Sequence, residues 1–284
     1  WIDEATMQGG AISVVTFYSC QQPPISALKS RLEAVFSKNP WLAGRLRTGA
    51  SGKPVILIPM ESKMPRFIKD AFLHAGDVGL RPGMEYTDMA TKCGNFQAKQ
   101  GQDCLDKDEP LFRVTTVDAG PCQCAVVVSM CHVLGDAHCF YQIYGMLDPR
   151  TSLRTLDPIR KECFKEELVE AVGKQKFEIQ HSASSAIPIL LGNAFRPKFQ
   201  QSIRLINDSW IQEEKQRHQD HGNADVPWIS TNDALTSWWF KTSGATYSIM
   251  YTNCRNKLPS ITYDLAGNYV ASIDYFPEEF STPA

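Results

Sequence analysis

A chain of 284 residues is long enough for one large domain or two smaller ones, and for a substantial core. Hydrophobic residues make up 43% and charged residues 21%, and the formal net charge is -2, with Lys and Arg spread along the chain. This net charge and the even spread of Lys and Arg exclude the basic stripe that a nucleic-acid-binding protein carries. No apolar run approaches the ~20 residues that cross a bilayer, so we expect no membrane span.

The start of the sequence and its cysteines bear on the cellular compartment. The first residue is Trp1, with no initiator Met and no signal-peptide layout. We therefore expect a fragment, or a chain that lacks some residues, of a cytoplasmic protein, and any N-terminal targeting segment could have been lost with them. The nine Cys residues are scattered and form no C-x-x-C pair, which favours free thiols in a reducing compartment over a zinc site.

The first hundred residues predict strands and a helix. Ala11–Tyr18 is rich in β-branched and aromatic residues, as strands are. Ile25–Ser37 repeats apolar side chains at helical spacing and ends before Pro40. Pro54–Pro59 predicts a short strand between two prolines. Residues 61–110 carry weak periodicity and predict loops with short helices.

The clearest pattern is a hairpin followed by a helix. Leu111–Val117 alternates as a strand should, and Cys124–Met130 is apolar almost throughout, which predicts a strand that is buried on both faces. Ala137–Leu147 predicts a helix with Asp136 as its N-cap. A histidine, His132, thus stands between the end of a buried strand and the start of a helix.

This arrangement suits general-base chemistry. A histidine at a strand end is held by rigid neighbours, and its imidazole is neutral near physiological pH. The alternative is a purely structural role, in which His132 packs near a turn and Asp136 serves only as the N-cap of the helix. A metal site from His132, Asp136 and His138 is a further alternative, but the spacing is irregular and no fourth ligand appears, so we expect no metal.

The rest of the chain predicts a charged, partly helical connection and then three more elements. Residues 152–176 form that connection. Ser230 opens a helix that continues to Lys241, with hydroxyl and carboxylate groups at its start. Thr246–Asn253 and Tyr269–Ile273 predict strands, the second after a turn at Gly267-Asn268. Strands that alternate with helices but include a hairpin indicate an α/β or α+β class with a mixed sheet; of the two, we expect α/β.

Four segments, in order, resemble the BAHD acyltransferases of the chloramphenicol-acetyltransferase-like superfamily. Residues 39–46 (NPWLAGRL) are similar to the family's P-x-L-A-G-R-L segment, and residues 132–136 to its H-x-x-x-D motif. Residues 230–235 (STNDAL) resemble its S-T-x-D-A-L helix start. Residues 253–258 (NCRNKL) with Gly267-Asn268 resemble its R-x-R-L…G-N segment.

The resemblance implies an acyl-CoA-dependent O- or N-acyltransferase with two mixed α/β lobes. His132 would be the general base, and Asp136 would orient its loop by pairing with Arg255. Ser230, Thr231 and Asp233 would lie near the CoA channel, although helix capping is the stronger explanation for them. Acyl-CoA would be a co-substrate rather than a resident cofactor, and the acceptor a small alcohol or amine.

The sequence also departs from the family. Ala137 follows the motif Asp where the family has Gly, and the late D-F-G-W-G motif is absent. We expect an N-terminal lobe at residues 1–151, a connection at 152–225, and the start of an incomplete second lobe at 226–284.

Two other functions remain open. One is a condensation-type relative whose donor rides on a carrier protein; those proteins usually carry a second His where Cys131 stands, and Gly where Ala137 stands. The other is a non-catalytic binding or assembly subunit. Serine-hydrolase chemistry has no G-x-S-x-G segment to support it.

Overall fold

The computed structural model describes residues 4–20, 23–174, 177–178, 205–221, 226–244 and 247–280. Two compact units form: unit 1 comprises Trp1–Lys165 and Arg255–Tyr269, and unit 2 comprises Glu166–Cys254 and Val270–Ala284. The assignment of residues 152–225 as a connection between lobes stays a prediction. Residues 175–176, 179–204 and 222–225 of that connection lie outside the described ranges.

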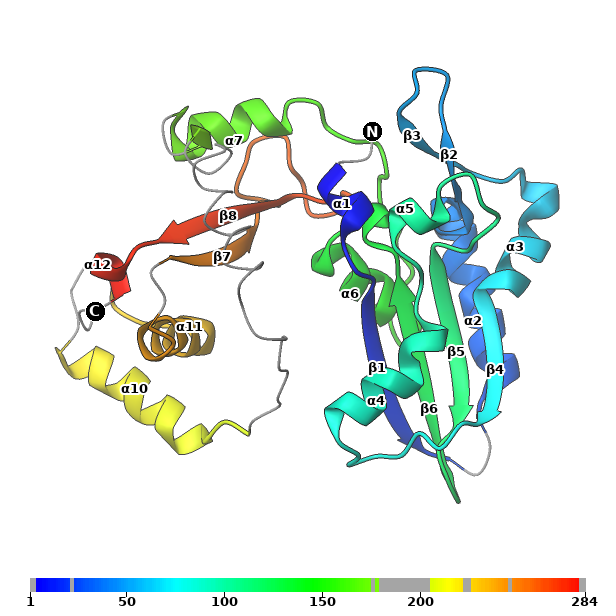
Figure 1. Ribbon diagram of the computed structural model, residues 1–284, viewed down its shortest axis with the longest axis horizontal. Helices are drawn as coiled ribbons and strands as arrows, with labels where there is room; N and C mark the ends of the chain where they lie inside the picture. The colour runs from blue at the N-terminus through cyan, green and yellow to red at the C-terminus, as the bar shows by residue number, and fades with distance from the viewer. Residues whose placement is uncertain are drawn as a thin grey trace, which may run out of the picture. The chain divides into compact units, whose positions relative to one another are not determined.

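Unit 1 is built on a four-stranded mixed sheet in the order β1-β6-β5-β4, which can be followed from edge to edge in Figure 1. Strand β6 pairs antiparallel with both β1 and β5, and β4 pairs parallel with β5. The four strands are β1 (Ile12–Ser19), β4 (Phe72–Asp77), β5 (Phe112–Asp118) and β6 (Gln123–Met130). The predicted strands at the start of the chain and in the hairpin are confirmed.

Each face of this sheet carries its own core, because successive residues of a strand point to opposite faces. Val126, Val128 and Met130 pack with helices α2 (Ile25–Lys38) and α6 (Ala137–Met146) on one face. Ala125 and Val127 pack on the other face with helix α4 (Tyr86–Cys93). Strand β6 is buried on both faces, as its apolar sequence predicts.

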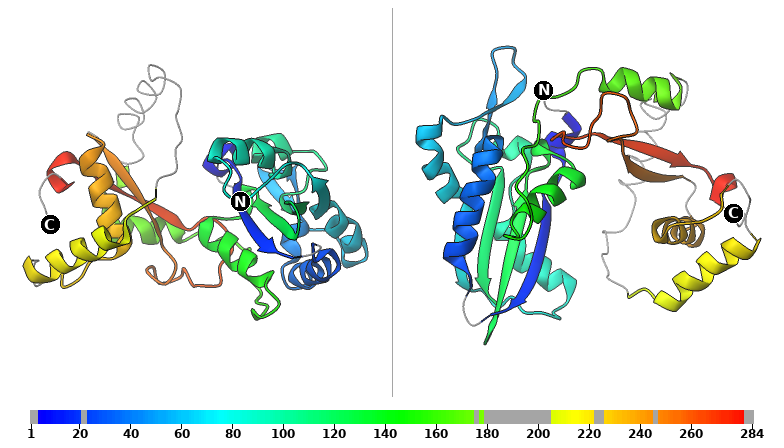
Figure 2. Two further views of the ribbon diagram at one scale, coloured as in Figure 1. Left: turned by 90° about the horizontal axis from the view of Figure 1, so that it is seen from below. Right: turned by 180° about the vertical axis from the view of Figure 1, so that it is seen from behind.

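Short elements complete unit 1, and Figure 2 shows them from two further sides. The helical pieces are α1 (Glu4–Gln8), η1 (Pro40–Ala43), η2 (Glu61–Lys63), α3 (Met64–Ala71), η3 (Gly94–Phe96), α5 (Gly101–Cys104) and η4 (His132–Leu134). The small antiparallel pair is β2 (Arg45–Thr48) and β3 (Pro54–Leu57). Residues 61–110 therefore hold short helices, as predicted, but also strand β4, which the sequence analysis missed.

The segment 39–46 is tied to its surroundings by two buried polar side chains. Asn39 is fully buried; its Nδ2 donates to the Arg154 carbonyl at 2.9 Å, and its Oδ1 accepts from the Leu156 amide at 2.9 Å. Arg45 is 3% exposed and forms ion pairs with Asp70 at 3.2 Å and Asp108 at 3.1 Å. Both residues therefore act in packing this segment.

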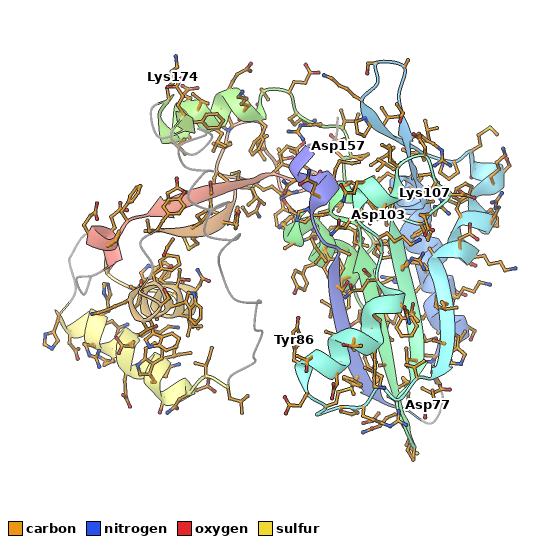
Figure 3. The ribbon with its side chains drawn as sticks, in the orientation of Figure 1. Asp77, Tyr86, Asp103, Lys107, Asp157 and Lys174 are labelled. Atoms are coloured by element: carbon orange, nitrogen blue, oxygen red, sulfur yellow. A yellow bond between two sulfur atoms is a disulfide. The ribbon has the colours of Figure 1, made fainter. Side chains whose placement is uncertain are left out.

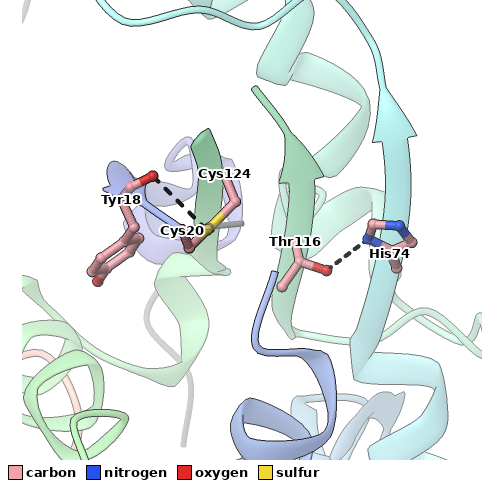
Figure 4. The surroundings of a disulfide bond; sticks show 5 residues. All are labelled: Tyr18, Cys20, His74, Thr116 and Cys124. Atoms are coloured by element: carbon pink, nitrogen blue, oxygen red, sulfur yellow. Dashed lines mark hydrogen bonds between the residues drawn. A yellow bond between two sulfur atoms is a disulfide. The ribbon is translucent and has the colours of Figure 1, made fainter. Parts of the chain in front are cut away.

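Cys20 and Cys124 form a disulfide where the ends of β1 and β6 meet, with Cα atoms 6.3 Å apart (Figure 4). The expectation that all nine cysteines are free thiols is wrong for this pair. The pairing register of β1 and β6 brings the two residues together across 104 positions of sequence, which a local pattern does not reveal. The other seven cysteines form no disulfide in the structure.

Unit 2 contains helices and a two-stranded sheet. Its elements are α7 (Phe164–Val172, shared with the end of unit 1), α10 (Asp208–His221), α11 (Thr231–Thr242), β7 (Ser248–Asn253), β8 (Val270–Tyr275) and α12 (Pro277–Phe280). Strands β7 and β8 pair antiparallel. The predicted helix after Ser230 and the two late strands are confirmed, apart from Thr246, which lies outside the described residues. Across the described ranges, no helix is long and apolar enough to cross a membrane.

Candidate functional site

His132 begins the short 3-10 turn η4. The buried strand β6 ends at Met130, and Cys131 lies between the strand and the turn. The Cys131 amide donates to the Leu111 carbonyl at 2.7 Å, which fixes the strand end. The backbone of Gly9 lies against the imidazole, since a side chain there would come within 3.3 Å of three His132 carbons. His132 therefore lies between the end of strand β6 and the residue that follows helix α1.

The imidazole presents its two nitrogens differently. Nδ1 of His132 is enclosed and has no hydrogen-bond partner in the described part of the chain, whereas the side chain as a whole is only partly buried. An enclosed nitrogen cannot exchange a proton with a bound molecule. Nε2 is therefore the nitrogen that a substrate can reach.

Asp136 is 2% exposed, and its carboxylate accepts three hydrogen bonds. Oδ1 accepts from the Cys139 amide at 3.0 Å, which is the N-cap bond of α6 that the sequence predicts. Oδ2 accepts from Nη1 of Arg255 at 2.7 Å and from the Tyr269 amide at 3.0 Å. The cap and the ion pair thus share one carboxylate, so Asp136 is more than a cap.

Arg255 is the cationic half of this pair, and its side chain is 0% exposed. Nε donates to the Leu265 carbonyl at 2.9 Å and Nη2 to the Gly267 carbonyl at 2.9 Å. Its guanidinium also stands 5.1 Å from the centre of the Tyr269 ring. A buried ion pair offsets its desolvation cost only when the remaining donors are satisfied in this way.

Two glycines allow the loops to meet. A side chain at Gly135 would come within 2.7 Å of the Cys139 side chain and 3.3 Å of the Gly267 amide nitrogen. Gly267 has φ +119°, which favours glycine, and its carbonyl accepts from the Asp136 amide at 3.1 Å. The turn that follows His132 is therefore fixed by a segment more than a hundred residues later.

Ala137, where the resembling family has glycine, is the first residue of α6 and is exposed. Its φ is not among the positive values found in the described residues. Alanine is the best helix former, so this departure fits the local backbone.

The imidazole of His138 contacts Tyr263. Its Nε2 is 3.2 Å from the Tyr263 carbonyl, and its ring meets the Tyr263 ring edge to face at 4.8 Å between centres. Burial first, and then the nearby Arg255 cation, lowers the pKa of His138 below its ordinary 6.5. No cluster of three or more metal-ligating side chains occurs in the ranges that the structure describes.

Ser230, Thr231 and Asp233 lie in unit 2 and are engaged in a helix start. Ser230 Oγ accepts from the Asp233 amide at 3.1 Å, and Asp233 Oδ2 accepts from the Ser230 amide at 2.8 Å. This is a capping box. Thr231 Oγ1 accepts from Lys215 Nζ at 2.9 Å. Contact of these three residues with CoA stays a prediction.

A cavity of about 330 Å³ adjoins the turn that follows His132. Residues of η1, η4 and the Gly267 loop contribute to its wall, among them Trp41, Val133, Leu134, Gly267 and Tyr269. The indole Nε1 of Trp41 is buried and has no hydrogen-bond partner among the described residues. Sequence reasoning missed this cavity, because the segments that line it are distant in sequence.

Among solved structures, several are similar to this chain over nearly all of its length. TRI101 of F. sporotrichioides, complexed with coenzyme A and T-2, matches with a TM-score of 0.52 and 15% identity over 98% of this chain and 66% of that one. TRI101 of F. graminearum, complexed with ethyl coenzyme A, matches with a TM-score of 0.57 and 12% identity over 99% and 69%. The first condensation domain of the calcium-dependent antibiotic synthetase, in complex with a substrate analogue, matches with a TM-score of 0.53 and 12% identity over 93% and 63%.

These likenesses establish the fold. The mixed sheet and its covering helices have the chloramphenicol-acetyltransferase-like architecture that the sequence predicts, and the chain spans about two thirds of the length of these three structures. No family model matches the sequence, and no curated protein matches it.

Proposed function

We propose that this chain transfers an acyl group from acyl-CoA to a hydroxyl or amine acceptor, with His132 as the general base. The observation that carries the proposal is the buried contact between Asp136 and Arg255, which holds the turn that follows His132. Two structures of similar fold are complexes with coenzyme A or ethyl coenzyme A, which supports this choice of donor.

The chemistry follows from an imidazole at a fixed position. Nε2 of His132 would take the proton from the acceptor O–H or N–H, and the freed electron pair would attack the thioester carbonyl carbon. The tetrahedral oxyanion would then collapse, breaking the C–S bond. The proton held on Nε2 would pass to the sulfur, so that free CoA thiol and the acylated acceptor leave.

Asp136 and Arg255 would act as positioning residues in this scheme. Their side chains are buried against the Gly267 and Tyr269 segment, and they are occupied with each other. They would keep the backbone after His132 in one conformation, which lowers the cost of orienting the base in the transition state.

The body of the acceptor would occupy the cavity of about 330 Å³ beside Val133 and Leu134, and its reacting hydroxyl or amine would extend beyond the cavity toward His132, which is not part of the wall. This volume lies within the range of small-molecule sites.

The test is acyl-CoA turnover, followed as free thiol with a panel of alcohols and amines. We expect His132→Ala to reduce turnover by about 100-fold or more while its circular dichroism spectrum is unchanged. His138→Gln is the matched control, since it removes a neighbouring imidazole. Undiminished turnover in His132→Ala would eliminate His132 as the base. If the unaltered chain shows neither turnover nor CoA binding, the binding or assembly subunit becomes the better interpretation.

A further inference from the structure

Unit 1 contains a second cavity, of about 610 Å³, that shares no wall residue with the cavity beside η4. It lies among the first half of α2, the end of α6 and strands β1 and β6, and its wall includes Leu28, Val126 and Tyr144. Small-molecule sites typically have volumes of about 300–1,000 Å³, with mostly apolar walls and a few polar groups. This cavity therefore has the dimensions of a ligand site that the proposed reaction does not use.

The floor of the cavity is apolar. Val126 and Val128 come from β6, with exposed fractions of 7% and 0%, and Leu147 follows the end of α6 with 8%. Tyr18 and Tyr144 add aromatic rings to the wall, and Tyr18 is 47% exposed. A ligand that fills this space needs an apolar body.

Arg31 supplies a fixed positive charge to the same wall. Its Nε donates to the Met146 carbonyl at 2.7 Å, and its Nη2 donates to the carbonyls of Asp148 at 3.0 Å and of Thr151. These three acceptors are uncharged main-chain groups, and within the described ranges Arg31 has no carboxylate at ion-pair distance. Nη1 is left without a protein acceptor there, in a guanidinium that is already immobilised.

The other two charges of the wall neutralise each other. Arg150 Nη2 lies 2.7 Å from Asp148 Oδ2, and this contact is the main cause that lowers the pKa of Asp148 to about 2. Arg31, Asp148 and Arg150 are the charged residues of the wall, so its net charge is two positive minus one negative, or +1. An anionic ligand is therefore favoured over a cationic one.

One wall residue of the cavity is a glycine inside a helix. Gly145 lies inside helix α6 and lines the cavity, and a Cβ added there would meet no atom within 4 Å. Glycine inside a helix costs about 0.5–1 kcal/mol relative to alanine. The chain thus has a helix-weakening residue where space for a side chain exists.

We propose that this cavity binds a small carboxylic acid with an apolar body. The carboxylate would accept from Arg31 Nη1, and the body would lie on Val126 and Val128. Arg and carboxylate groups match in geometry and form strong, charge-assisted hydrogen bonds. The inference rests on unit 1 alone and is independent of the proposed acyl transfer.

The experiment is calorimetric titration of the full chain with 2-naphthoate and with octanoate, which separate a flat aromatic body from a flexible aliphatic one. The uncharged control is 2-naphthamide. We expect at least one acid to bind with a Kd below about 1 mM, and 2-naphthamide to bind about tenfold or more weakly than 2-naphthoate, since a hydrogen bond to a charged group contributes about 1.5–3 kcal/mol.

Cavity-filling variants locate the binding. Gly145→Leu and, from the exposed rim on α2, Ala27→Trp should each weaken binding by about tenfold or more, whereas Gly145→Ala and His132→Ala should leave it within about twofold. Two fillers are used so that one misfolded variant does not decide the outcome. Three results would each overturn the proposal: no binding of either acid, equal binding of the naphthamide, or undiminished binding to both fillers.

Discussion

Asp136 Oδ2 lies 2.7 Å from Arg255 Nη1, and this contact joins two buried residues that are 119 positions apart in the chain. The same carboxylate oxygen accepts from the Tyr269 amide. One side chain therefore caps helix α6, pairs with an arginine and holds a returning loop. The conformation of the turn after His132 depends on a residue that belongs to a distant part of the sequence.

Breaking this pair should be costly. We expect Asp136→Asn and Arg255→Met each to lower the free energy of unfolding by about 3–5 kcal/mol, because each leaves a buried polar group without its partner. The double variant should lose less than the sum of the two singles. Urea unfolding of the four proteins measures this, and additive losses would mean that the pair is not coupled.

Gly135 should tolerate no side chain. Gly135→Ala places a methyl group 2.7 Å from the Cys139 side chain, so we expect a loss of about 1–3 kcal/mol in stability. The matched control is Gly145→Ala, where the methyl group meets open space within a helix and should add up to about 1 kcal/mol. Thermal unfolding compares the two, and equal shifts in Tm would contradict the steric argument.

Ser230 separates helix capping from contact with CoA. Ser230→Ala removes the acceptor for the Asp233 amide and should cost about 1 kcal/mol, whereas Ser230→Asn retains a capping oxygen and should cost little. The KM for acyl-CoA is the second measurement. If KM rises in both variants while stability falls in only one, Ser230 contacts the donor directly.

His138 should make stability depend on pH. Its pKa is lowered in the folded chain, so the unfolded chain takes up a proton first as the pH falls below 6.5. The contribution of neutral His138 to the free energy of unfolding is complete above pH 6.5 and decreases as the pH falls toward the lowered folded-state pKa. Urea midpoints between about pH 7.5 and 5.5 test this, with His138→Gln as control. Identical pH profiles for the two proteins would refute it.

The sequence analysis succeeded where burial imposes a regular pattern. The β5–β6 hairpin, helix α2 and the Asp136 cap were predicted because their apolar residues recur at the period of the element, or because the cap stands at its fixed offset. Strand β4 was missed because it lies at the edge of the sheet, and its residues Phe72–Asp77 alternate neither in polarity nor in burial.

Long-range pairings were beyond local reasoning. The Cys20–Cys124 disulfide depends on strand register, and the partner of Asp136 was predicted only through the family resemblance. The cavity beside η4 is found only when three distant segments are assembled around it. Figure 3 shows Asp157 and Asp77 at opposite ends of unit 1; the backbone at Asp157 pairs with Asp264 and Ala266, a link that no sequence period signals.

The interruption of unit 1 in sequence has a consequence for how the protein is made. Its body is encoded by Trp1–Lys165, but Arg255–Tyr269 is needed to cover the Asp136 carboxylate and to fix the turn after His132. During synthesis the ribosome adds about 5–20 residues per second, so several seconds separate the emergence of the two halves of the ion pair. Until then Asp136 lacks its cation. The turn that follows His132 is therefore completed only after Arg255–Tyr269 has emerged.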